Sequence, residues 1–197
     1  FQNTVDQCLA KLKPYQHEPI PTVPIQMATN ICNFLEALIT KDVFKQSENI
    51  DETKRRLGYI FAFSFIWGIG GSLDSSSHDR VSSFEKFKDL FDYIAKDIFK
   101  HLVFPKNENV FDFFVDTDNY SFNNWETRVD DFEYVKDTPY FQLLVPTTDT
   151  TKYSTVMEYL ITTQKPTFLT GYTGVGKSVI TQNLLFKLKV KYSHSFS

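Results

Sequence analysis

Residues 171–178 combine types and spacing that are suited to binding phosphate. They read Gly-Tyr-Thr-Gly-Val-Gly-Lys-Ser, which fits the G-x-x-x-x-G-K-[ST] pattern of phosphate-binding loops. The three glycines allow positive φ and let backbone N–H groups approach phosphate oxygens closely. Lys177 would reach the β- and γ-phosphates of a nucleotide, and the Ser178 hydroxyl would bind Mg²⁺. The sequence therefore predicts a nucleotide site made by Gly171, Tyr172, Thr173, Gly174, Val175, Gly176, Lys177 and Ser178.

The elements expected around this loop would position its residues. Phe168-Leu169 is expected to form a short apolar strand before the loop, and a helix is expected to begin at about Lys177. The first turn of that helix would add unpaired N–H groups and the positive end of the helix dipole. A glycine-rich hairpin turn is the alternative interpretation. The strand–loop–helix context favours nucleotide binding, because the helix has an apolar face at Val179, Ile180, Leu184, Leu185 and Leu188.

The sequence after the loop is short for a complete nucleotide hydrolase. Nineteen residues follow Ser178. Hydrolysis also needs an acidic residue that positions Mg²⁺ and water, and groups that sense the γ-phosphate. We therefore assign no catalytic residue, and we do not expect this stretch alone to hydrolyse ATP. The chain also begins with Phe1 rather than Met, and we expect it to be a piece of a larger protein.

Composition limits the classes of function. The chain has 197 residues, 42% of them hydrophobic and 23% charged, as in ordinary globular domains. Its formal net charge of -3 argues against a dedicated nucleic-acid binder, which would normally be basic. The sequence contains no run of about 20 apolar residues, the length that a membrane-spanning helix needs. We expect neither nucleic acid nor membrane as a partner.

Metal-binding patterns are weak in this sequence. Cys8 and Cys32 do not have the spacing of a metal or redox site, and two reduced thiols are expected, as in an intracellular setting. The spacing of Asp116 and Asp118 matches the first two ligand positions of an EF-hand calcium loop. We nevertheless prefer to interpret these residues as part of a solvated acidic surface. The calcium pattern fails because its next required positions carry Tyr120, Ser121 and Thr127.

Apolar periodicity predicts four helices in the first hundred residues. They are expected near residues 5–12, 25–39, 51–67 and 79–100. Asp51 is expected to cap the third helix, and three glycines are expected to stop it. Between the second and third helices, a polar loop is expected. The stretch 1–103 thus reads as one compact helical subdomain, with its third helix stopped at Gly68, Gly70 and Gly71.

From Phe104 onward the sequence pattern changes from helical periodicity to strand-like and turn-rich stretches. Residues 110–115 are expected to form a strand, residues 116–124 a turn and residues 125–129 a return strand, so that 104–142 is a connector with a β-hairpin. Phe141–Val145 is a short apolar run. From residue 143 the expected order is helix, strand, phosphate-binding loop and helix, with Thr147–Thr151 capping the helix. This order is the opening of a doubly wound α/β domain.

At this point the sequence resembles dynein heavy chains, because several short motifs occur in that family's order over about residues 30–189. The resemblance covers the end of a lid helix, the segment after it, the stretch that precedes the third AAA+ module, and that module's phosphate-binding loop. Only the loop is widespread among nucleotide hydrolases. The matching stretches are residues 63–71 (FSFIWGIGG), Arg80 with Phe84 and Phe87, Phe104-Pro105, residues 110–112 (VFD), residues 145–150 (VPTTDT) and residues 171–178 (GYTGVGKS).

The resemblance implies a fold and a ligand. The chain would run from the helical lid of a second AAA+ module, through a connector with short strands, into the α/β domain of the third module. The ligands would be ATP or ADP with Mg²⁺. Segments before the first strand of AAA+ domains commonly line the adenine, which gives Val145, Pro146 and Thr147 that expected role. The commoner loop has Pro and Thr at the positions of Tyr172 and Val175, and backbone contacts to phosphate should survive both changes.

The resemblance also implies a role. The parent would be a motor that moves toward microtubule minus ends, with a third nucleotide site that is mainly regulatory. Its partners would be the other AAA+ modules, microtubules, and dynein intermediate and light chains. It would act in the cytoplasm and cytoskeleton. The Tyr-Thr-Gly-Val sequence of the loop favours an axonemal dynein of cilia or flagella.

Two other classes of function stay open from the sequence. The chain could belong to an unrelated P-loop kinase or GTPase, although no N-K-x-D base-recognition motif is present. It could also be a structural module with a vestigial loop, against which the intact lysine and serine argue. Lys177→Ala separates these cases, because it should abolish nucleotide affinity unless the loop is vestigial.

Overall fold

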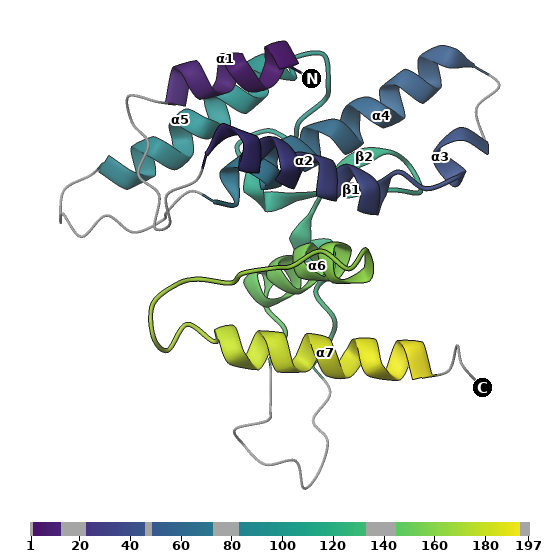
Figure 1. Cartoon of the computed structure of the whole chain (residues 1–197), viewed down its shortest axis with the longest axis vertical. Helices are drawn as coiled ribbons and strands as arrows, with labels where there is room; N and C mark the ends of the chain where they lie inside the picture. Colours follow the sequence, from purple (N-terminus) through teal and green to yellow (C-terminus); the bar gives the residue numbers. More distant parts are fainter. Residues whose placement is uncertain (1, 13–22, 46–48, 73–82, 133–144, 194–197) are drawn as a thin grey trace, which may run out of the picture. The chain divides into compact units, whose positions relative to one another are not determined.

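The structure is a computed structural model that describes residues 2–12, 23–45, 49–72, 83–132 and 145–193. The chain divides into two compact units, Phe1–Asn124 and Trp125–Ser197, and the described part of each is mainly helical (Figure 1). The boundary expected at residue 142, and the apolar run that begins at Phe141, fall among residues 133–144, outside the described residues.

The first unit contains the four expected long helices. They are α1 (Gln2–Leu12), α2 (Pro24–Leu38), α4 (Ile50–Phe65) and α5 (Ser83–Ile98). Helix α1 packs against α5, and α2 packs against α4 (Figure 1). The fourth helix was expected from residue 79, and residues 79–82 lie outside the described residues. The polar loop expected between α2 and α4 contains a short helix, α3 (Asp42–Lys45), because Val43 is buried there.

The two ends of α4 differ from the sequence-based expectation. Asn49, not Asp51, is the N-cap, because the Asn49 side chain accepts a hydrogen bond from the Asp51 backbone N–H at 3.0 Å. At the other end the helical run passes Gly68 and ends at Gly70, next to Gly71, so two of the three glycines expected to stop it do lie at its end. The last part of this run is a π-helical turn, η2 (Ile66–Gly70), which packs against α2. A β-carbon on Gly68 would lie 2.7 Å from the backbone nitrogen of Ile31, so this glycine permits close packing rather than ending the helix.

A β-hairpin completes the first unit. Strand β1 (Phe113–Asp116) pairs antiparallel with β2 (Ser121–Asn124), and Asp116 lies opposite Ser121 in the register. The expected first strand begins late, because a capping box by Asn109 folds η3 (Val110–Asp112) into a 3₁₀ turn. The expected return strand at 125–129 was wrong. The strand is β2, and residues Trp125–Arg128 form the 3₁₀ helix η4.

One carboxylate explains why the hairpin turns early. The Asp116 carboxylate accepts hydrogen bonds from the Asp118 backbone N–H at 2.9 Å and from the side-chain amides of Asn119 and Asn123 at 3.0 Å each. It therefore closes the turn on itself, as aspartate commonly does. Within the described ranges, no group of three or more His, Cys, Asp or Glu is placed to hold a metal ion.

The described part of the second unit contains η4, α6 (Thr148–Thr162) and α7 (Lys177–Ser193). Helix α6 packs against both η4 and α7. Its expected cap is confirmed, because Thr147 and Thr150 form a capping box. The expected start of α7 at Lys177 is also confirmed.

The strand expected at Phe168-Leu169 is not formed. The described part of the chain offers this segment no strand to pair with, since its only sheet is the β1–β2 hairpin. Phe168 is 77% exposed, as expected for an apolar residue without a neighbouring sheet. Leu169 is half-buried against the helices of the second unit. Among the described residues, no helix has the length and hydropathy needed to cross a membrane.

Candidate nucleotide-binding loop

The backbone of residues 171–178 has the curvature that a phosphate-binding loop requires. Gly171, Gly174 and Gly176 have φ of 151°, 87° and 81°, a region that other residues rarely adopt. A β-carbon on Gly174 or Gly176 would meet nothing within 4 Å, so the requirement at these two positions is conformational rather than steric. The loop runs directly into α7, where the Ile180 N–H donates to the Gly176 carbonyl at 2.9 Å.

Lys177 is folded back over the loop. Its ammonium donates to the Gly171 carbonyl at 2.8 Å and to the Tyr172 carbonyl. No ion pair joins it to a carboxylate among the described residues. One of its three N–H donors is therefore available for an anion. The sequence predicted the lysine, but it gave no sign that two loop carbonyls would hold it in place.

Ser178 lies in the first turn of α7 with its side chain exposed. Its hydroxyl makes no hydrogen bond to a described residue, so it is free to bind a cation beside a phosphate. The described residues bring no cluster of carboxylates to the loop. If Mg²⁺ binds here, Ser178 is the described residue that could supply a ligand to it, and this role stays a prediction.

The other loop side chains point to a backbone-based site. Tyr172 is 51% exposed and Val175 is 56% exposed, and Thr173 is exposed as well. All three side chains are thus accessible to solvent. Peptide N–H groups and the N-terminus of α7 would supply most contacts to a bound phosphate.

A small apolar cluster fixes α7 beneath the loop. Ile180, Leu184 and Leu188 on α7 pack with Met157 of α6, and the half-buried Ile161 and Leu169 pack against them. Leu169 lies two residues before Gly171, so the entrance of the loop is anchored to the same cluster. The loop is therefore held at both ends, even though the expected strand is absent.

Charged side chains add support along the last turns of α7. Lys187 pairs with Asp130 at 3.3 Å, and Lys191 pairs with Glu158 at 2.8 Å. These pairs are largely exposed, and each contributes little to stability, typically below about 1 kcal/mol. They help to orient α7 but add little to the stability of the fold.

The segment expected beside the adenine begins α6. The Thr150 N–H donates to the Thr147 hydroxyl at 3.2 Å, and the Thr147 N–H donates to the Thr150 hydroxyl at 2.8 Å. The Thr147 side chain is therefore used by the cap, which leaves the exposed Val145 and the half-buried Pro146 to face a ligand. The role of these residues next to a base stays a prediction.

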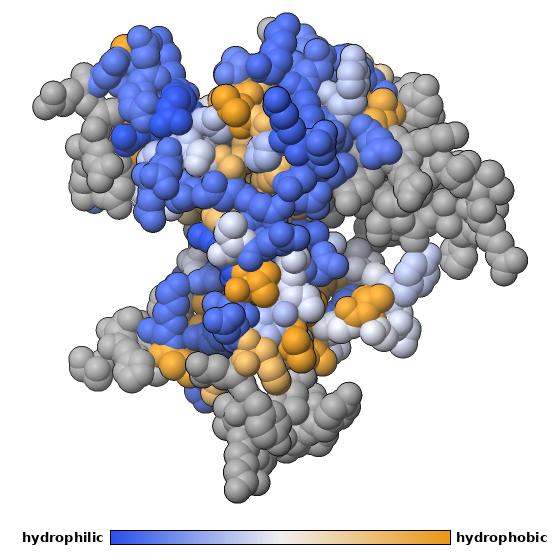
Figure 2. Space-filling model, turned by 180° about the vertical axis from the view of Figure 1, so that it is seen from behind, coloured by the Kyte–Doolittle hydropathy of each residue, from blue (hydrophilic) through white to orange (hydrophobic). Residues whose placement is uncertain are grey.

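The surface of the second unit is partly apolar. Figure 2 shows apolar side chains reaching the surface of this unit on the face that it displays. On α7, Leu185, Phe186 and Val190 are 51%, 68% and 45% exposed, although the opposite side of this helix is buried against α6. Helix α7 therefore has apolar residues on more than one side.

Comparison with known families divides the chain into two matches. A family model described as "Dynein heavy chain AAA lid domain" matches residues 1–127. A second model, described as "P-loop containing dynein motor region", matches residues 132–197. The second match includes the whole glycine-rich loop.

Individual relatives agree with these models. The human protein "Dynein axonemal heavy chain 6" is 33% identical over 195 residues, which is 96% of this chain and 4% of the relative. The Chlamydomonas reinhardtii protein "Dynein beta chain, flagellar outer arm" is 30% identical over 186 residues, 94% of this chain and 4% of the relative. The Tripneustes gratilla protein "Dynein beta chain, ciliary" is 32% identical over 171 residues, 86% of this chain and 4% of the relative. The chain thus spans about 4% of the length of these relatives.

Proposed function

The chain belongs to the dynein heavy chain family, and on that premise we propose that residues 171–178 bind ATP or ADP as part of a dynein motor. The observation that carries this proposal is the geometry of the loop. Three glycines at positive φ lead into the N-terminus of α7, and Lys177 lies over the loop with a donor to spare. The predicted fold class, a helical lid followed by the start of a P-loop domain, is confirmed.

In this proposal each loop residue has a binding role rather than a reacting one. Peptide N–H groups of residues 173–178 hold phosphate oxygens, and the α7 dipole favours their negative charge. The Lys177 ammonium contacts the β- and γ-phosphates. Ser178 supplies one ligand to Mg²⁺, whose charge would balance that of the phosphates when it is bound. Val145 and Pro146 lie along the adenine.

The site is proposed to be mainly regulatory. The described loop residues supply groups that bind phosphate, namely backbone N–H groups and the Lys177 ammonium. Binding and exchange of nucleotide would then change the state of the motor. Residues 1–197 alone are not expected to hydrolyse ATP.

The setting of the motor is proposed from its relatives. The names of several relatives include axonemal, flagellar or ciliary, and we place this chain in the axoneme of a cilium or flagellum, within the cytoskeleton. Its partners would be the other AAA+ modules of the same heavy chain, the microtubule, and intermediate and light chains. Movement would be toward microtubule minus ends.

Calorimetric titration of Mg·ADP tests the nucleotide proposal. The protein should contain residues 1–197 together with the remainder of its nucleotide domain. Lys177→Ala should abolish measurable binding, because the charged contact to the β- and γ-phosphates is lost. Lys187→Ala is the matched control, because Lys187 also lies on α7 but pairs with Asp130 away from the loop, and its affinity should be unchanged.

Two results would contradict the proposal. A folded wild-type protein that does not bind Mg·ADP would indicate a vestigial loop and a structural role for this segment. Equal affinity in Lys177→Ala and the wild type would place the nucleotide elsewhere in the protein.

A further inference from the structure

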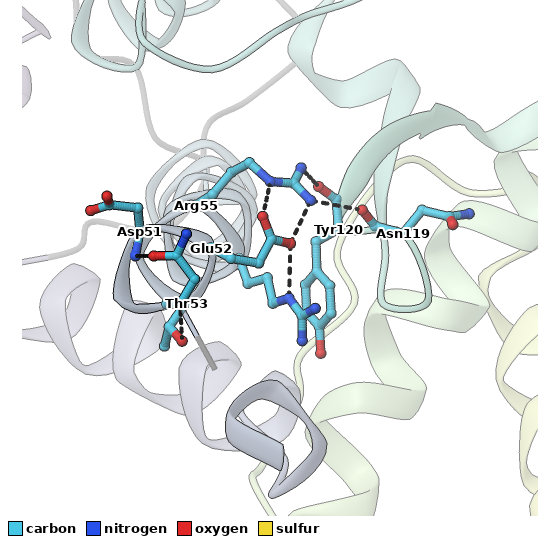
Figure 3. Close-up of polar contacts among 8 residues, drawn as sticks. Asp51, Glu52, Thr53, Arg55, Asn119 and Tyr120 are labelled. Carbon is cyan, nitrogen blue, oxygen red and sulfur yellow. Dashed lines mark hydrogen bonds and ion pairs between the residues drawn. The ribbon is translucent and has the colours of Figure 1, made fainter. Parts of the chain in front are cut away.

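A cluster of charged residues joins the start of α4 to the tip of the β-hairpin (Figure 3). The Glu52 carboxylate accepts hydrogen bonds from Arg55 Nε at 2.9 Å, from Arg55 Nη2 at 2.8 Å and from Arg56 Nε at 3.1 Å. One carboxylate therefore orients two neighbouring guanidinium groups. Such charged, partly bidentate contacts are both strong and directional.

Both arginines use this orientation to hold the same turn. Arg55 Nη1 donates to the Tyr120 carbonyl at 2.9 Å, and Arg55 Nη2 lies 3.4 Å from the Asn119 carbonyl. The Arg56 guanidinium lies over the Tyr120 ring, 4.8 Å from its centroid. Helix α4 thus contacts both the backbone and the side chain of Tyr120 (Figure 3).

Tyr120 has a backbone conformation that its residue type does not favour. Its φ is 48°, in the left-handed region that favours glycine or asparagine, and its side chain is buried. Asn119, which tolerates this region better, lies one position earlier. The contacts from α4 compensate for the strain at Tyr120, which makes the shape of the turn dependent on the helix.

The buried arginine depends on Glu52 in particular. The Arg56 side chain is 11% exposed, and its Nη1 atom has no acceptor among the described residues. Glu52 is the carboxylate that pairs with it in the described part of the chain. Removing the charge of Glu52 would leave a buried cation without its counterion, which is far less favourable than losing an exposed ion pair.

A second contact joins the same two elements farther along. Phe122 of β2 packs edge-to-face on Tyr59 of α4, with ring centroids 5.0 Å apart. Strand β2 is the last element of the first unit, and the chain passes directly from Asn124 into Trp125 of the second. The hairpin therefore lies on the covalent route from the helical unit to the nucleotide loop.

We propose that Glu52, Arg55 and Arg56 form a joint through which α4 and the β1–β2 hairpin open and move together. A change in α4 would then be passed to the segment that enters the second unit, and a nucleotide-dependent change would be passed back. The exchange of signals with the loop rests on the proposed nucleotide binding. The joint between α4 and the hairpin does not.

Amide hydrogen exchange on the complete polypeptide that contains residues 1–197 tests the joint. Glu52→Gln and Arg55→Ala should raise exchange in the hairpin and in the first turn of α4 by the same factor, about tenfold for a lost charged contact. Arg55→Lys should not restore protection, because an ammonium cannot hold a carboxylate and two carbonyls in the fork geometry of arginine. Lys54→Ala is the control, since Lys54 lies on the same turn and pairs with the exposed Asp51.

The outcomes are distinct. Increased exchange in the hairpin alone, or no increase in any of these variants, would overturn the joint. If Glu52→Gln unfolds the protein, Arg55→Lys still decides, because it keeps a positive charge at the same place.

Hydrogen exchange with and without Mg·ATP tests the coupling between the nucleotide loop and the hairpin. Saturating Mg·ATP should change hairpin exchange in the wild type and should leave it unchanged in Glu52→Gln at the same nucleotide affinity. A wild type that binds nucleotide without any change in the hairpin would refute this coupling and leave the nucleotide site intact. A wild type that does not bind would instead refute the proposed function.

Discussion

At the scale of single residues, Lys177 is the group on which the account depends most. Two loop carbonyls already hold its ammonium close to Gly171 and Tyr172. A lysine placed in this way loses little side-chain freedom when a phosphate arrives, because its conformation is largely set beforehand. Under the proposed function, the observed position of Lys177 would thus favour phosphate binding.

Glu52 makes a pH-dependent prediction at this scale. Hydrogen bonds from Arg55, and then from Arg56, lower the pKa of Glu52 to about 2. A carboxylate whose folded-state pKa is lowered stabilises the fold above its unfolded pKa of about 4.3, and this contribution disappears as pH falls toward the folded value. The stability difference between the wild type and Glu52→Gln should be constant from about pH 5 to 8 and should shrink from about pH 4 down to pH 2.

Urea unfolding of both proteins across that pH range measures the difference. Asp51→Asn is the matched control, because Asp51 lies on the same turn with an exposed side chain. A difference that stayed constant down to pH 2 would contradict the assignment of the effect to the ionised Glu52.

The two cysteines should differ in reactivity. Burial raises the pKa of the Cys8 thiol to about 12, and this side chain is fully buried, whereas Cys32 is exposed. Since the thiolate is the reactive form, Cys8 should be inert in the folded protein at pH 8. Titration with a thiol reagent should modify Cys32 rapidly and Cys8 only after unfolding. Rapid modification of Cys8 in Cys32→Ser would show that α1 is not packed as described.

At the scale of elements, the end of α4 depends on close packing. Gly70 lies in η2, and a β-carbon there would be 2.5 Å from the Phe111 ring and 2.7 Å from the Phe91 ring. Phe91 is fully buried, Phe111 is half-buried, and the two rings are stacked with centroids 5.5 Å apart, which restricts their movement.

Gly70→Ala should therefore destabilise the helical unit. We expect a loss of about 1–3 kcal/mol from overpacking, measured by thermal or urea unfolding. Gly58→Ala in the middle of α4 is the control. Its β-carbon would lie 3.3 Å from the flexible end of Leu102, and alanine favours helix there, so its stability should be unchanged or higher. Equal effects of the two substitutions would contradict the packing of η2 against Phe111.

The elements also show where sequence reasoning succeeds and where it fails. Amphipathic periodicity located the long helices, and the loop pattern located the start of α7 at Lys177. The hairpin was misplaced because local side-chain bonds of Asn109 and Asp116 decide where its strands begin and end. The strand at Phe168 failed because a strand needs a partner, and apolar character alone does not provide one.

At the scale of the whole molecule, the exposed apolar side chains of α7 lead us to expect that residues 1–197 associate with one another. Leu185 and Phe186 are exposed on α7, and Phe168 is exposed before the loop. Large exposed apolar side chains of this kind can mark surfaces that other chains cover. We expect residues 1–197 produced alone to self-associate.

Phe186→Glu should reduce that association, because it places a charge on the exposed face of α7. Sedimentation velocity at several protein concentrations measures the effect. Phe44→Glu, at an exposed position on α3, is the control and should leave the association unchanged. A wild-type chain that stays monomeric at all concentrations would refute the expectation.

The sequence predicted more of the glycine-rich loop than of its surroundings. The pattern of residues 171–178 located the loop and the start of α7, whereas the role of these residues in binding nucleotide stays a prediction. The contacts of Arg55 and Arg56 with the hairpin could not be predicted, because they join residues 64 or 65 positions apart and no local pattern records them. The hydrogen bonds from the Lys177 ammonium to the loop carbonyls were also not predicted, because they depend on the conformation of the lysine side chain.

The most direct test of the account is an experimental structure of the complete nucleotide domain with Mg·ADP. The account predicts phosphates seated on the N–H groups of residues 173–178, with the Lys177 ammonium within hydrogen-bonding distance of the β-phosphate and Mg²⁺ beside Ser178. A nucleotide bound elsewhere, or an empty loop at saturating Mg·ADP, would contradict it.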